Sequence, residues 1–109
     1  MALQHASSGQ VFALQRSDED GAQFSSIALA KTDEIELIRM VLPAGKIMPE
    51  HWVKGEITLQ CLSGEIAVEA HGRTATLHGG EMLYLAGATP HALRAVADSV
   101  ALLTILLKS

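Results

Sequence analysis

The chain has little of the chemistry that several large protein classes require. Cys61 is the one cysteine among 109 residues, so an internal disulfide and the cysteine-rich zinc modules are excluded. Aromatic side chains make up 4% of the residues and the formal net charge is −4. A nucleic-acid interface needs a basic surface and usually stacking rings, so we expect no nucleic-acid partner.

Long apolar runs are also missing. The longest, "VALLTILL" at 100–107, is about half the length of a membrane-spanning helix. The opening segment "MALQHASSGQVF" has no charged region followed by an apolar run, which a secretory signal requires. We therefore expect no membrane association and a cytoplasmic location.

The chain does contain a regular succession of short apolar segments separated by turn residues. This spacing, with glycine, proline and aspartate between the segments, is typical of an all-β sandwich or barrel. His71 and Gly72 should form a two-residue hairpin loop, because glycine readily adopts the positive φ of such a turn. No linker or repeat interrupts the pattern, so we expect one domain, 1–109, whose residues 1–9 form a flexible tail. The expected strands cover residues 10–14, 24–30, 34–42, 56–62, 65–70, 73–77, 81–86, 91–97 and 100–107.

Alternation of polar and apolar residues predicts which side chains face the interior. Within 56–62, "EITLQCL", the apolar row should point inward, because successive side chains of a strand face opposite ways. Glu56 belongs to the polar row and should face outward. Charged Arg94 should also face outward, and alternation then turns His91 inward. When the apolar row of 56–62 is continued toward the N-terminus it includes His51, which should therefore also face inward. The side chains expected to line an interior pocket are His51, Val53, Ile57, Leu59, Cys61, His91 and Leu93.

Two glycine-framed motifs each contain one histidine. Gly45 and Gly64 frame His51, and Gly80 precedes His91 with ten residues between them. With these motifs, at 45–64 and 80–95, the chain resembles the small single-domain members of the cupin superfamily, the RmlC-like barrels. The resemblance implies a cupin-type double-stranded β-helix, which is an all-β jelly-roll barrel. It also implies a homodimer, since small cupins commonly dimerise.

A second argument for a partner copy comes from the strand expected at 100–107. This segment is apolar on both faces, so both sides of the strand need cover. A small barrel has one interior, and the other side must meet either the N-terminal strands or another subunit.

Departures from the family's motifs concern the metal ligands. Val53 stands where the family has its second histidine and Ile57 where it has glutamate, so His51 and His91 are the ligand positions that remain. Catalytic metal sites usually have three protein ligands. The sequence therefore predicts no cofactor, or a weakly bound divalent metal such as zinc, iron, manganese or nickel. In the second motif the proline, glycine and asparagine positions hold Ala86, Ala88 and Ala95.

One device would restore a third ligand. Gly55 precedes Glu56, and a glycine inside a strand pattern often marks a β-bulge. A bulge here would shift the alternation by one residue and turn Glu56 inward. His51, His91 and Glu56 would then form a two-histidine, one-carboxylate metal set.

Two imidazoles in an aliphatic lining favour a barrel that binds a small organic molecule, with His51 and His91 as polar anchors. A small carboxylate or a planar aromatic would suit such a pocket better than a sugar, which needs many hydrogen-bonding partners. The alternative, by family analogy, is a metal-dependent enzyme such as a dioxygenase or an isomerase. A dimeric structural module with a vestigial pocket is the third hypothesis.

Overall fold

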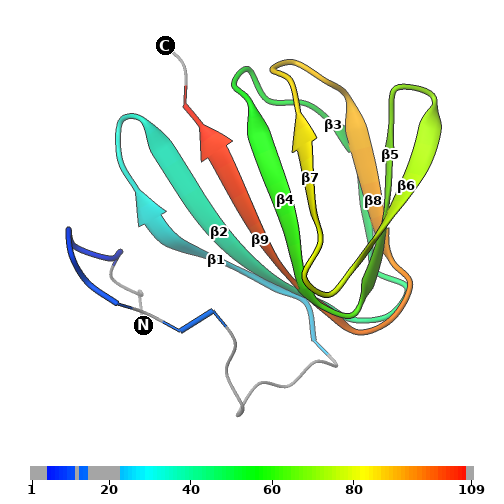
Figure 1. The fold of residues 1–109 in the computed structure, drawn as a ribbon, viewed down its shortest axis with the longest axis horizontal. Coiled ribbons are helices and arrows are strands. Elements are labelled where there is room, and N and C mark those ends of the chain that lie inside the picture. Colours follow the sequence, from blue (N-terminus) through cyan, green and yellow to red (C-terminus); the bar gives the residue numbers. More distant parts are fainter. Residues whose placement is uncertain (1–4, 12, 15–22, 108–109) are drawn as a thin grey trace.

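Two antiparallel β-sheets face each other in the computed structural model, which describes residues 5–11, 13–14 and 23–107 (Figure 1). The five-stranded sheet has the order β1-β2-β9-β4-β7 and the four-stranded sheet the order β3-β8-β5-β6. In the described part of the chain, no helix has the length and apolarity needed to cross a membrane. The strands are β1 (Ser25–Lys31), β2 (Ile35–Leu42), β3 (Ile47–His51), β4 (Ile57–Ser63), β5 (Glu65–Ala70), β6 (Arg73–His78), β7 (Met82–Leu85), β8 (His91–Ala95) and β9 (Ser99–Leu106).

The all-β fold class predicted from the sequence is confirmed, and so is the hairpin turn between β5 and β6. His71 and Gly72 have φ angles of 54° and 74°, and Ala70 pairs with Arg73 across the turn. A two-residue turn with two positive φ values matches the right-handed twist of the flanking strands.

The prediction of a strand at 10–14 is wrong, because none of the four residues that the structure describes in this segment lies in a strand. Residue 12 lies outside the described residues. Val11 is 93% exposed, so its apolar side chain does not mark a strand packed on a core. The carbonyl of Leu14 accepts a hydrogen bond from Nε of Arg39 instead of a bond from a neighbouring strand. The apolar residues described in this segment therefore do not pair with a neighbouring strand.

Strand β3 was missed by the sequence prediction. It contains Pro49 and Glu50 and shows no apolar alternation. Proline lacks the N–H that a ladder needs, so it is tolerated on a strand at the edge of a sheet. β3 is such an edge strand, because it pairs with β8 alone, and its register shifts between Met48 and His51.

The core lies between the two sheets and follows the predicted alternation. In β4 the side chains of Ile57, Leu59 and Cys61 are at most 5% exposed, whereas the residues between them are half-buried. Complete burial of an aliphatic side chain contributes about 1.5–3 kcal/mol. The side chains below 2% exposure are Leu42, Ile66, Val68 and Cys61.

The segment 52–56 carries the chain from β3 in one sheet to β4 in the other. Gly55 lies in this link and not inside a strand, and the pairing of β4 with β7 is regular from Ile57 onward. A Cβ at Gly55 would lie 1.7 Å from the carbonyl oxygen of Leu106. Glycine is therefore needed here for close backbone approach, and the bulge that would have turned Glu56 inward is not present between Gly55 and the start of β4.

The outer face of the five-stranded sheet is partly covered by the N-terminal residues. The N–H of Ala6 donates to the carbonyl of Leu29 at 2.8 Å, and Arg39, on the outer face of β2, is 3% exposed beneath Leu14. Toward β7 the same face stays open, with Met82 58% exposed. The flexible tail and the homodimer both stay predictions, and residues 1–4 of that tail lie outside the described residues.

Candidate ligand cavity

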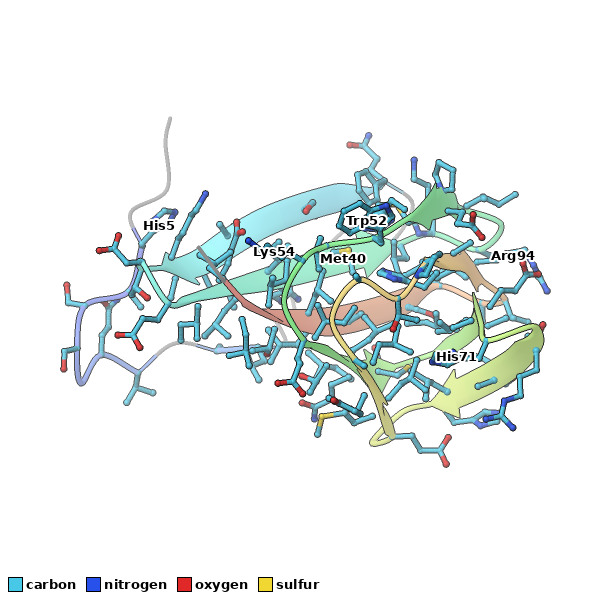
Figure 2. The ribbon with its side chains drawn as sticks, turned by 90° about the horizontal axis from the view of Figure 1, so that it is seen from above. His5, Met40, Trp52, Lys54, His71 and Arg94 are labelled. Atoms are coloured by element: carbon cyan, nitrogen blue, oxygen red, sulfur yellow. The ribbon has the colours of Figure 1, made fainter. Side chains whose placement is uncertain are left out.

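A cavity of about 210 Å³ lies between the two sheets. Figure 2 labels Met40, one of its lining residues, in the interior of the molecule. Three lining side chains carry a polar nitrogen or oxygen, namely Ser26, His51 and His91. The others are aliphatic or methionine: Ile38, Met40, Met48, Ile57, Leu59, Val68, Leu83, Leu85, Leu93, Leu103 and Ile105.

The two histidines stand side by side because their strands are paired. His51 ends β3, His91 begins β8, and the two residues are register partners in the four-stranded sheet. Their ring centroids are 4.5 Å apart and the ring planes are inclined by 55°. His91 is 5% exposed, while His51 is exposed. The pair therefore presents two adjacent imidazoles on an otherwise aliphatic wall.

Backbone carbonyls favour the same tautomer in both rings when the rings are neutral. Nδ1 of His91 is 2.9 Å from the carbonyl oxygen of Thr89, and Nδ1 of His51 is 3.3 Å from that of Pro49. A carbonyl oxygen only accepts, so in each pair Nδ1 carries the proton and donates. Nε2 is then the ring nitrogen that carries the lone pair. Each neutral ring therefore offers a ligand an acceptor.

The cavity reaches solvent between the edge strands of the two sheets. Among its lining residues, Ser26 and His51 are exposed, and they come from β1 and β3. β1 ends the order of the five-stranded sheet and β3 ends that of the four-stranded sheet. Trp52, 60% exposed, follows His51 directly and is labelled in Figure 2.

A family model described as Cupin domain matches residues 38–107, a span that contains both glycine-framed motifs. The chain belongs to the cupin family. The predicted family membership and the double-stranded β-helix are thus confirmed. No curated protein matches this cupin.

Solved structures show the same fold. A Streptococcus pyogenes protein of unknown function is 20% identical, with a TM-score of 0.81, over 100% of this cupin and 96% of that chain. A cupin superfamily protein from Desulfitobacterium hafniense is 17% identical, with a TM-score of 0.82, over 99% of each chain. An RmlC-like cupin from Desulfovibrio desulfuricans is 26% identical, with a TM-score of 0.74, over 94% of this chain and 97% of that one.

Two of the residues expected in the pocket of this cupin lie elsewhere. Cys61 is 0% exposed and packs in the core without lining the cavity, because the cavity ends before the last inward position of β4. Val53 belongs to the link before β4, where strand alternation does not apply, and packs on the cluster of Ile57, Leu85 and Ile105. The predicted pocket residues that do line the cavity are His51, His91, Ile57, Leu59 and Leu93.

Further lining residues were not among the predicted ones. Ile38 and Met40 in β2, and Leu103 and Ile105 in β9, alternate with outward-facing neighbours. Their period of two was a usable signal, but it does not say which inward positions border empty space. Ser26 carries no such signal, since it lies in the polar start of β1.

Glu56 is not among the residues that line the cavity. Its carboxylate accepts a hydrogen bond from the hydroxyl of Tyr84, which is 58% exposed on β7. Tyr84 pairs with Thr58 in the outward-facing row of β4. The structure thus places Glu56 with the outer row, and it does not bring this carboxylate together with His51 and His91.

The donors of this cavity do not fit a resident catalytic metal. His51 and His91 offer two Nε2 lone pairs, held in place by the bonds from Nδ1 to backbone carbonyls. The described residues contain no group of three or more histidine, cysteine, aspartate or glutamate side chains that could hold an ion. Catalytic sites usually have three protein ligands, so we derive no chemical step through a metal.

The pairing of Tyr84 with Glu56 predicts a measurable titration. The hydrogen bond to Glu56 raises the pKa of Tyr84, and desolvation and the negative charge of the carboxylate act in the same direction. Ionising the phenol would lose that bond and place two negative charges together. Tyr84 is the one tyrosine of the chain, so tyrosinate absorbance reports it alone. We expect a midpoint above the ordinary value of about 10, which Glu56→Gln should lower.

The matched control for this titration is Glu81→Gln. Glu81 is also an exposed carboxylate, but it is bonded to His78. The Glu81→Gln variant should leave the titration midpoint of Tyr84 unchanged. An unshifted midpoint in Glu56→Gln would show that Glu56 is not the partner of Tyr84 in solution.

Proposed function

We propose that this cupin binds a small organic molecule in the cavity between its sheets, with His51 and His91 as the polar anchors. The observation that carries the proposal is the adjacent imidazole pair on a mainly aliphatic wall, with Nδ1 of each ring beside a backbone carbonyl oxygen. Ligand sites are typically concave and mainly apolar, with a few convergent polar groups that orient the ligand. The role we propose is binding, because the described lining offers two adjacent imidazoles and the hydroxyl of Ser26 on a mainly aliphatic wall.

Ligand binding should be visible as thermal stabilisation. A ligand at about 100 times its Kd adds about 2.7 kcal/mol to the free energy of unfolding if it binds the folded state alone. We expect at least one member of a panel of small monocyclic aromatics and carboxylates to raise Tm, and His91→Ala to abolish that gain. His71→Asn is the matched control, because His71 lies in the exposed β5–β6 turn and asparagine tolerates its positive φ.

The metal-dependent alternative is separated from this proposal by one assay. Protein purified without added ions should contain well under one metal ion per chain, and a chelator should leave its Tm unchanged. A metal bound only to the folded state would stabilise it, so stoichiometric metal together with a chelator-induced fall in Tm would replace this proposal with the enzyme hypothesis.

A further inference from the structure

We infer that the cavity takes a neutral hydrogen-bond donor carried on a single aromatic ring, a ligand of the phenol class. This inference rests on the proposed function and names the ligand chemistry of the same site. Three observations lead to it: the direction of the available hydrogen bonds, the charge of the lining, and the size and composition of the wall.

The direction of hydrogen bonding selects a donor. Both Nδ1 atoms are committed to the carbonyls of Thr89 and Pro49, so the two neutral imidazoles present acceptors. A ligand carbonyl or ether oxygen would meet lone pairs at the two imidazoles and leave them unmatched, and the hydroxyl of Ser26 belongs to β1 in the other sheet. A hydroxyl group on the ligand supplies the missing proton to one of the imidazoles, and the acceptor of buried His91 is the one that is costly to leave unpaired.

The charge of the lining disfavours an anion. None of the described residues that line the cavity is lysine, arginine, aspartate or glutamate. A carboxylate could bind there only if one imidazole took up a proton to balance it, since an unpaired charge in apolar surroundings is strongly unfavourable. A neutral phenol needs no such proton. The two ligand classes therefore differ in proton uptake on binding.

The size and composition of the wall select one ring. An engineered apolar cavity of about 150 Å³ accommodates benzene, so a cavity of about 210 Å³ has room for a ring with one small substituent besides the hydroxyl. Met40 and Met48 both line the cavity, and methionine sulfur makes favourable contacts with aromatic rings. Aliphatic side chains supply the rest of the surface apart from Ser26 and the two histidines.

Three probes of similar size test this on the full-length protein by isothermal titration calorimetry. para-Ethylphenol has the hydroxyl donor, its isomer para-methylanisole has the same atoms without a donor, and benzoate carries the charge. We expect para-ethylphenol to bind about tenfold more tightly than para-methylanisole, which is the value of one hydrogen bond. The comparison is made at about pH 8, where a phenol stays neutral and a histidine of ordinary pKa has lost its second proton.

The double variant His51→Leu, His91→Leu supplies a readout that misfolding cannot imitate. It should lose the preference for para-ethylphenol while it still binds para-methylanisole, since the aliphatic wall is intact. Wild-type protein that binds both isomers equally overturns the inference. So does benzoate that binds more tightly than para-ethylphenol with uptake of a proton, although this result would leave the proposed binding function standing. If none of the three probes binds and no panel member raises Tm, both proposals fail.

Discussion

Replacing Gly55 by alanine should lower the free energy of unfolding by about 3–5 kcal/mol or more, a large share of the stability of a domain this size. The new Cβ would lie 1.7 Å from the carbonyl oxygen of Leu106, inside any possible contact distance. The obstructing atom is backbone, so no rotamer change relieves the overlap. β9 cannot withdraw freely either, because the N–H of Leu106 donates to the carbonyl of Glu56 at 2.9 Å.

Chemical denaturation with a matched alanine substitution measures this cost. Gly79→Ala is the control, because Gly79 has no positive φ and its Cβ would meet nothing nearer than 3.4 Å. It should change the midpoint little. If Gly55→Ala were no less stable than Gly79→Ala, the close approach of the β3–β4 link to β9 would not exist in solution.

The second large effect concerns the thiol of Cys61, which should be alkylated at least about a thousandfold more slowly in the folded protein than in denaturant. The side chain is 0% exposed, so reagent reaches it only when the structure opens. Burial raises the pKa of Cys61, the nearby Glu81 carboxylate adds to the rise, and a backbone hydrogen bond with Ser63 opposes it. The thiolate is the reactive species, and the raised pKa keeps the thiol in its unreactive neutral form while the protein is folded.

The sign of the pH dependence follows from that raised pKa. Folding favours the neutral thiol, so this contribution to stability is complete below the ordinary thiol pKa and is lost as pH rises through the folded-state pKa. Protection from alkylation should therefore weaken on the alkaline side. Mass spectrometry reads the product directly, because Cys61 is the one cysteine.

An exposed thiol in the same protein provides the comparison. Thr74→Cys in a Cys61→Ala background places a thiol on the exposed face of β6. That cysteine should react at nearly the rate of an unfolded chain. Native Cys61 reacting as fast as this control would contradict the burial of β4 in the core.

Strand alternation predicted an all-β sandwich or barrel, and the cupin resemblance of the two glycine-framed motifs implied the double-stranded β-helix. The inward row of β4 and the inward positions of β8 came from a charged residue, Arg94, and from simple polar–apolar alternation. The backbone conformation of the second motif is also kept where alanine replaces a glycine. Ala88 stands at the glycine position and still adopts a φ of 61°, while its N–H donates to the carbonyl of Val53 at 2.8 Å.

What could not be predicted depends on contacts across the two sheets. Val53 was placed in the pocket because alternation was carried through a link that is not a strand. Cys61 is inward-facing as expected, but the alternation cannot tell filled core from empty space. The role of Gly55 depended on Leu106, which lies fifty-one positions further along the chain. Local pattern contains no information about such a distant neighbour.

The entrance between β1 and β3 also sets how a guest would exchange. Ladder pairing joins β1 to β2 and β3 to β8, so the two rims belong to separate hydrogen-bonded networks. A guest that passes between these two strands therefore breaks no ladder hydrogen bond between them. Exchange would then proceed on the timescale of side-chain and loop motions, far faster than global unfolding. A ligand that stays bound in this cavity for a long time must therefore do so through its contacts with the lining, and not because the entrance is closed.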